Sequence, residues 1–124
     1  MIDIDDFFVL LTEVCDELPD DFFRELHQGV VLSEETKISP YARNDDLVIL
    51  GEYRSARYGN QITIYYGSFD RNWHNCSREF IKDRLREVVR HEFRHHMENL
   101  SGMHGRDSLE HEDKVQLRKY LRKD

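Results

Sequence analysis

Two histidines and a glutamate near position 92 have the spacing of a metal-dependent hydrolytic site. They belong to the segment HEFRHH, residues 91–96. In a helix, residues four apart lie about 40° apart around the axis and about 6 Å apart along it. His91 and His95 can therefore bind one Zn²⁺ ion together, each at about 2.0–2.1 Å. Glu92 lies to the side, where its carboxylate can take a proton from zinc-activated water and pass it to a leaving amine.

The motif lies inside a segment with strong helical periodicity. Apolar residues recur every three or four positions over 77–101, which predicts one long helix, and Gly102 is suited to follow its C-terminal end. The chain contains 7 His and is rich in acidic residues, so residue frequencies alone give about a 4% chance of an accidental HExxH. The helical context is what the proposed chemistry requires.

A zinc hydrolase usually has a third protein ligand and an open fourth position. Asp107 is the preferred third ligand, because it follows Gly102 and Gly105, at which the chain can turn back toward the helix. Glu98 is the second choice, since it lies seven residues after His91 and its side chain leans toward the helix N-terminus. The same stretch offers His104 as the third choice, then Glu110 and His111.

The rest of the chain predicts an α+β fold. Helical periodicity is found near the N-terminus, short apolar or alternating segments follow, and helical periodicity then returns. The three central segments predict a small, mainly antiparallel sheet of three to four strands, with the turn-like residues 55–60 closing a hairpin. The predicted elements are helices 3–18, 20–26, 77–101 and 109–121, and strands 29–32, 47–50 and 61–66.

Size and charge limit the classes of function. A length of 124 residues suits a single domain, 1–124. The net charge of -7, from 18 Lys and Arg against 25 Asp and Glu, disfavours binding to nucleic acids or anionic membranes. The N-terminus has no signal-peptide pattern, and no apolar run is long enough to span a membrane. Two lone cysteines fit a reduced compartment. We therefore expect a cytoplasmic location.

The chain resembles the minimal zincin, or zincin-like metallopeptidase, family of small bacterial proteins. The resemblance covers most of the chain, through FFVLLTEVCDELPDDFF, LVILGEYR, QITIYYGSF and LREVVRHEFRHHMENLSG. The best-known family motif is HExxHxxGxxD, whose Asp is implied to be the third zinc ligand. His91, Glu92 and His95 match it, but Glu98 takes the Gly position and Ser101 the Asp position. This departure suggests that the acidic ligand is displaced toward Asp107.

These observations favour a zinc-dependent metallopeptidase that hydrolyses peptide bonds with Glu92 as general base. The alternative is a metal-binding or interaction protein that keeps the fold with weak or no catalysis. A metal-dependent ribonuclease is a third hypothesis, which the acidic charge disfavours. Tyr65 and Tyr66 end a strand and are candidates for contact with substrate, although packing is the more ordinary role. His96 points about 100° away from His95 and is expected to support the site or lie at the surface.

Overall fold

This computed structural model describes residues 2–57 and 59–102, which fold into three α-helices and five short strands. The predicted α+β class is therefore confirmed. The predicted helix 109–121 lies outside the described residues. In chain order the elements are α1 (Ile4–Asp16), the 3₁₀ turn η1 (Asp20–Phe23), β1 (Gly29–Ser33), β2 (Lys37–Ile38), β3 (Val48–Ile49), β4 (Gly51–Ala56), β5 (Gly59–Tyr65), α2 (Tyr66–Trp73) and α3 (Arg78–Leu100).

The two longest helices begin and end within two residues of their predicted limits. Each has a side-chain N-cap, which satisfies an amide that lacks a partner within the helix. The Asp3 carboxylate accepts a hydrogen bond from the Asp6 amide of α1 at 2.8 Å. The Ser77 hydroxyl accepts one from the Phe80 amide of α3 at 3.2 Å. Gly102 follows α3 with a φ of 67°, a left-handed conformation that glycine adopts at little cost.

The larger sheet is mixed, whereas the sequence suggested a mainly antiparallel one. Its strand order is β1-β5-β4, in which β5 runs parallel to β1 and antiparallel to β4. The antiparallel pair is a hairpin at the predicted turn, but its first strand is β4 and not the predicted strand 47–50, which pairs with β2. The parallel pair arises because a long connection, which includes β2, β3 and β4, separates β1 from β5 and allows them to run in the same direction. The short strands β2 and β3 pair antiparallel in a second sheet.

Two of the longer elements were not anticipated. The first is β4, whose sequence GEYRSA contains few apolar residues and therefore gives no hydrophobic alternation. The second is α2, which begins at Tyr66, where the sequence suggested the end of a strand. The apolar run 47–50 contributes only the two residues of β3, and the chain enters β4 at Gly51.

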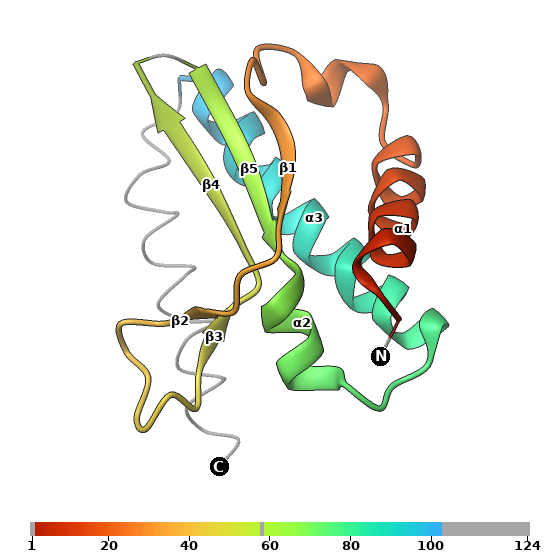
Figure 1. The fold of residues 1–124 in the computed structure, drawn as a ribbon. Coiled ribbons are helices and arrows are strands. Elements are labelled where there is room, and N and C mark those ends of the chain that lie inside the picture. The colour runs from red at the N-terminus through yellow and green to blue at the C-terminus, as the bar shows by residue number, and fades with distance from the viewer. Residues whose placement is uncertain (1, 58, 103–124) are drawn as a thin grey trace.

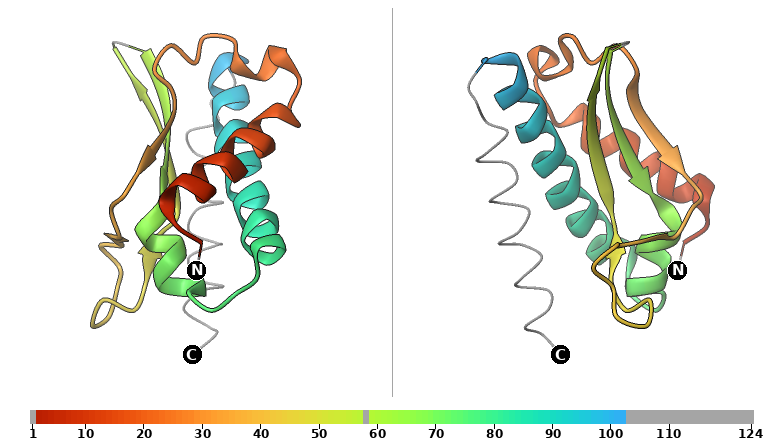
Figure 2. Two further views of the ribbon diagram at one scale, coloured as in Figure 1. Left: turned by 45° about the vertical axis from the view of Figure 1, so that its right-hand side comes forward. Right: turned by 90° about the vertical axis from the view of Figure 1, so that its left-hand side faces the viewer.

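The hydrophobic core lies between the sheet and the two long helices. In the view of Figure 1, α3 crosses behind β5 and β4, and α1 lies beside the N-terminal half of α3. The turned views of Figure 2 show the same arrangement from the side. Every fully buried apolar side chain removes surface from water, which is the main favourable contribution to folding. The core includes Phe7, Leu10, Leu11 and Val14 of α1, Ile62 and Ile64 of β5, and Ile81, Leu85, Val89 and Phe93 of α3.

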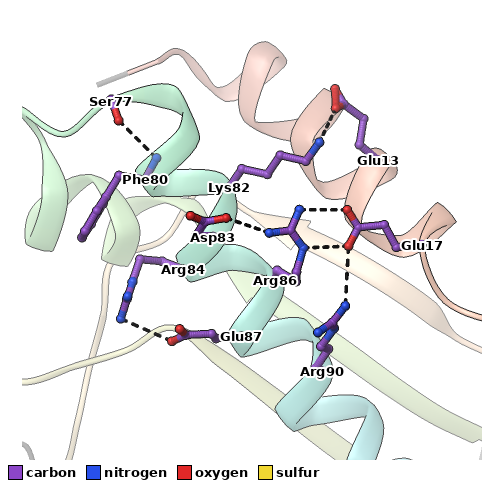
Figure 3. A network of polar contacts seen from close by, with 10 residues as sticks. All are labelled: Glu13, Glu17, Ser77, Phe80, Lys82, Asp83, Arg84, Arg86, Glu87 and Arg90. Atoms are coloured by element: carbon purple, nitrogen blue, oxygen red, sulfur yellow. Dashed lines mark hydrogen bonds and ion pairs between the residues drawn. The ribbon is translucent and has the colours of Figure 1, made fainter.

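Ion pairs join the outer surfaces of α1 and α3 above this core (Figure 3). The Glu17 carboxylate accepts hydrogen bonds from Arg86 Nε at 2.7 Å and Arg86 Nη2 at 2.9 Å. Lys82 Nζ donates to Glu13 Oε2 at 2.8 Å. Planar guanidinium groups suit such two-point contacts with carboxylates. None of the helices among the described residues has the length and apolar character to cross a membrane.

Candidate metal centre

His91, Glu92 and His95 lie together on the C-terminal half of α3. The Nε2 atoms of His91 and His95 are 2.9 Å apart. Their rings meet nearly at right angles, with centroids 4.5 Å apart and an interplanar angle of 86°. One potential ligand atom from each of the three residues falls within 4.8 Å of the other two. The helix therefore brings a carboxylate and two imidazoles to one point.

The three side chains differ in exposure. Glu92 is 6% exposed and His95 is 5% exposed, whereas His91 is only half-buried. The site is thus closed on the side of Glu92 and open on the side of His91. Glutamate is seldom so deeply buried in a folded protein, because desolvation of the carboxylate costs free energy. Such a residue in a cluster of titratable groups is a candidate for function.

One side of α3 holds Glu92 against the sheet. Val88, Glu92 and His96 follow one another at four-residue spacing and share this side of the helix. Val88 lies so close to β4 that a Cβ atom on Gly51 would be 2.8 Å from Val88 Cγ1. One turn beyond Glu92, His96 Nδ1 is 2.8 Å from the hydroxyl of Tyr53, also on β4. Glu92 therefore lies between two contacts with the same strand.

The donor set fits a divalent transition metal. Two nitrogens at about 2.0–2.1 Å from a tetrahedral ion lie about 3.3 Å apart. The observed 2.9 Å between His91 Nε2 and His95 Nε2 is a few tenths of an ångström shorter, so a small change of side-chain torsion would give the ligand geometry. Imidazole nitrogens with a carboxylate suit zinc, copper, iron and nickel, and zinc hydrolases use such sets. The same 2.9 Å also suits a hydrogen bond between the two rings.

Most candidates for a third metal ligand lie outside the described residues. The preferred residue, Asp107, lies outside the described residues, as do His104, Glu110 and His111. Glu98 is described, and it is not part of the compact group of three. Its Oε1 is 3.8 Å from Arg94 Nε. Its Oε2 is buried and accepts no hydrogen bond from the described part of the chain.

Neither tyrosine named from the sequence points its hydroxyl to the candidate centre. Tyr65 donates a short hydrogen bond to Glu52 and is also 3.3 Å from Lys37 Nζ. Tyr66 donates to the backbone oxygen of Ile2 at 2.6 Å. Each hydroxyl therefore has a structural partner, and the packing role is the one observed.

Tyr53, which the sequence pattern did not single out, contacts His96, one helical turn after Glu92. It belongs to the polar strand β4, which could not be predicted because its residues do not alternate between apolar and polar. Its hydroxyl also accepts a hydrogen bond from Asn99 Nδ2 at 3.1 Å. Burial raises the pKa of Tyr53 above its usual value, and hydrogen bonds with Asn99 and Ser55 act in the opposite direction. The hydroxyl is therefore protonated at neutral pH, as that of an ordinary tyrosine is.

His96 is completely buried, at 0% exposure. Of the two roles expected from the sequence, support of the site and a place at the surface, the surface is therefore excluded. His96 Nε2 lies 2.7 Å from the backbone oxygen of Arg24, and its ring is 5.4 Å from that of Tyr53.

The two cysteines do not join the candidate centre. Both Cys15 and Cys76 are free thiols. Burial, with a further contribution from Asp16, raises the pKa of Cys15 to about 11, so this thiol is protonated at neutral pH. In the described ranges 2–57 and 59–102, the group around His91 is the one set of three or more potential ligands that lie together.

Comparisons with known proteins give a relative but no function. No protein-family model matches the chain, and no curated protein matches it. Among solved structures, the chain is similar to a conserved hypothetical protein from T. thermophilus, with 32% sequence identity and a TM-score of 0.66. The match covers 81% of this chain and 98% of that protein. At this identity and coverage the likeness extends to the whole fold of that protein.

Proposed function

Because the chain belongs to the same family as the conserved hypothetical protein from T. thermophilus, whose name assigns no activity, we propose a function from the residues of the chain itself. The proposal is a zinc-dependent metallopeptidase that hydrolyses peptide bonds, with a zincin-like arrangement of the HExxH helix against a small sheet. His91 and His95 would hold the ion, Asp107 would complete the ligand set, and Glu92 would be the general base.

One observation supports this proposal above the others: the ligand atoms of His91, Glu92 and His95 lie within 4.8 Å of one another on a single helix. A helix surface that carries two histidines for packing or solubility has no need of a buried carboxylate beside them. Burial of that carboxylate has a cost in free energy. The cost is understandable if the group accepts a proton during a reaction.

The roles of the residues follow from their positions. A divalent ion at His91 and His95 would polarise a carbonyl group and lower the pKa of a water molecule. Glu92, at the closed side of the site, would accept the proton from the attacking water. It would then return that proton to the nitrogen of the departing amine. Because Glu92 and His95 are shielded from solvent, electrostatic interactions among these groups are stronger than they would be in bulk water.

The Glu92→Gln variant tests the proposal directly. Glutamine keeps the size of the side chain but cannot accept the proton. General base catalysis is worth about 10²–10⁴-fold in rate, and we expect hydrolysis of any peptide cleaved by the wild type to fall by that factor. Zinc affinity should change little, because His91 and His95 remain. The measurement is digestion of a peptide library by both proteins loaded with zinc, followed by mass spectrometry.

Two controls make this experiment decisive. Glu87→Gln alters an exposed glutamate on the same helix and should leave hydrolysis unchanged. Isothermal titration with Zn²⁺ checks that both variants bind the ion as the wild type does. Equal cleavage by wild type and Glu92→Gln would refute the general-base role. A zinc-loaded wild type that cleaves no peptide would instead favour the alternative, a metal-binding protein without significant turnover.

A further inference from the structure

A directional chain of hydrogen bonds joins the C-terminal part of α3 to β4 and to the segment after η1. A backbone oxygen can only accept, so His96 Nε2 must donate its proton to Arg24 O, 2.7 Å away. In the neutral ring, Nδ1 is then an acceptor, and the Tyr53 hydroxyl, at 2.8 Å, donates to it. Asn99 Nδ2 in turn donates to the Tyr53 oxygen at 3.1 Å and to the Ser55 hydroxyl at 3.3 Å. The partners determine the tautomer of His96.

This chain of bonds restrains the rotation of α3 about its axis. A side-chain atom about 6 Å from a helix axis moves by about 1 Å when the helix rotates by about 10°. Catalytic and metal-binding groups need placement to within about 0.5 Å. The close approach of Gly51 to Val88 lies one turn before Glu92, and the bond between Tyr53 and His96 lies one turn after it. A steric contact and a hydrogen bond thus restrain the helix on both sides of Glu92.

We propose that Tyr53 and His96 are positioning residues, which hold Glu92 and the pair His91 and His95 in register with β4. The inference rests on the metal site proposed above. It assigns no contact with substrate to Tyr53 or His96. Its physical content is that loss of the Tyr53 hydroxyl allows α3 to rotate and so alters the geometry at His91 and His95. Removal of an outer partner of a metal site typically weakens metal binding by about 10–100-fold.

The test uses the full chain with Co²⁺, whose visible absorption spectrum reports ligand geometry. Tyr53→Phe removes the hydroxyl and leaves the ring. We expect this variant to bind Co²⁺ about 10-fold more weakly than the wild type, with a changed absorption spectrum at saturation. Asn99→Ala removes an exposed partner of Tyr53 without disturbing the core, and a smaller shift in the same direction is expected.

Tyr66→Phe is the matched control. It also removes a hydrogen-bonded tyrosine hydroxyl, but one on α2 whose partner is the backbone oxygen of Ile2, at 2.6 Å. The inference is supported if the two variants lose a similar amount of thermal stability but differ in their cobalt spectra. Tyr66→Phe should then keep the wild-type spectrum, and Tyr53→Phe should change it. A wild-type spectrum and affinity in Tyr53→Phe, or equal changes in both variants, would overturn it. A wild type that binds no Co²⁺ would overturn the metal site itself, and the positioning role with it.

Discussion

Glu92 differs from the other glutamates of α3 in its surroundings. Glu79 and Glu87 are exposed and Glu98 is half-buried, whereas Glu92 is 6% exposed. Its position on the helix puts it on the side that packs against the sheet, where an apolar residue would be less costly. The other two members of its group are histidines, His91 and His95. A buried carboxylate beside two imidazoles is the residue-scale feature on which the proposed chemistry depends.

The identity of the third ligand gives a prediction at the same scale. Asp107→Ala should weaken Zn²⁺ binding by about 10-fold or more, because it removes one of the three proposed protein ligands. Glu98→Ala should have a clearly smaller effect, since Glu98 lies outside the compact group in α3. Competition titration against a chromophoric chelator measures both affinities. The reverse order of the two effects would move the third ligand onto α3 and refute the role of Asp107.

At the scale of elements, the contact between β4 and α3 depends on the absence of a side chain at Gly51. A Cβ atom there would be 2.8 Å from Val88 Cγ1 and 3.2 Å from Ile64 Cδ1. Val is branched at Cβ and cannot easily move its methyl groups. Gly51→Ala should therefore lower the free energy of unfolding by about 1–3 kcal/mol, the usual cost of overpacking a core. Urea denaturation monitored by circular dichroism measures this change.

A double-mutant cycle separates the steric clash between residue 51 and Val88 from the other effects of Gly51→Ala. Val88→Ala makes space opposite residue 51. By itself this substitution lowers the free energy of unfolding because packing contacts are lost. In the double variant, Gly51→Ala should cost less than it does alone, because the two sites are in contact and their effects should not add. Additive costs would show that the close approach of β4 to α3 does not limit stability.

The ion pairs between α1 and α3 predict a dependence of stability on pH. The hydrogen bonds from Arg86 lower the pKa of Glu17 below its usual value of 4.5, and burial acts in the opposite direction. A carboxyl whose pKa is lower in the folded state contributes stability above the unfolded pKa, and this contribution is lost as the pH falls through the folded pKa. Glu17→Gln should therefore be less stable than the wild type at pH 7, and the difference should shrink below pH 4.5.

Thermal unfolding of both proteins between pH 7 and pH 3 tests this dependence. Glu34→Gln changes an exposed carboxylate between β1 and β2 and is the control. Addition of salt at pH 7 should reduce the difference between wild type and Glu17→Gln, because exposed charges are screened. A difference that stays constant across the pH range would exclude an electrostatic contribution from Glu17.

At the scale of the whole molecule, the composition of the core predicts folding without a metal ion. Its buried apolar side chains come mainly from α1, β5 and α3 and extend well away from the candidate centre. We therefore expect the protein to remain folded in the presence of a chelator. Zinc at 100 times its dissociation constant should add about 2.7 kcal/mol of stability, which corresponds to a rise in melting temperature of about 10 °C for a domain of this size.

The double variant His91→Ala/His95→Ala provides the reference for this measurement. It should keep the far-ultraviolet circular dichroism of the wild type, because alanine favours helix. It should also lose the zinc-dependent rise in melting temperature. A double variant that still gains about 10 °C with zinc would show that the ion binds elsewhere. A wild type that unfolds on chelation would show that the core is insufficient by itself.

The sequence by itself determined the features that depend on local spacing. The helix limits near 4–16 and 78–100 follow from apolar periodicity and from capping residues such as Asp3 and Ser77. The grouping of His91, Glu92 and His95 follows from helical geometry, since His95 lies four residues after His91 and three after Glu92, and residues three or four apart are neighbours on a helix surface. A reversal of the chain near residues 55–60 was likewise expected from local turn residues, and the turn between β4 and β5 lies there, although β4 itself was not expected.

Only the tertiary structure decided which side of α3 meets the sheet. That choice buries Glu92 and His96 and leaves His91 accessible, and it depends on packing between segments far apart in the chain. The parallel pairing of β1 with β5 and the contact of Tyr53 with His96 also join segments far apart in the chain. Periodicity could not reveal Tyr53, because β4 has almost no apolar pattern and its register is set by its neighbour β5 and by the close approach of Gly51 to α3.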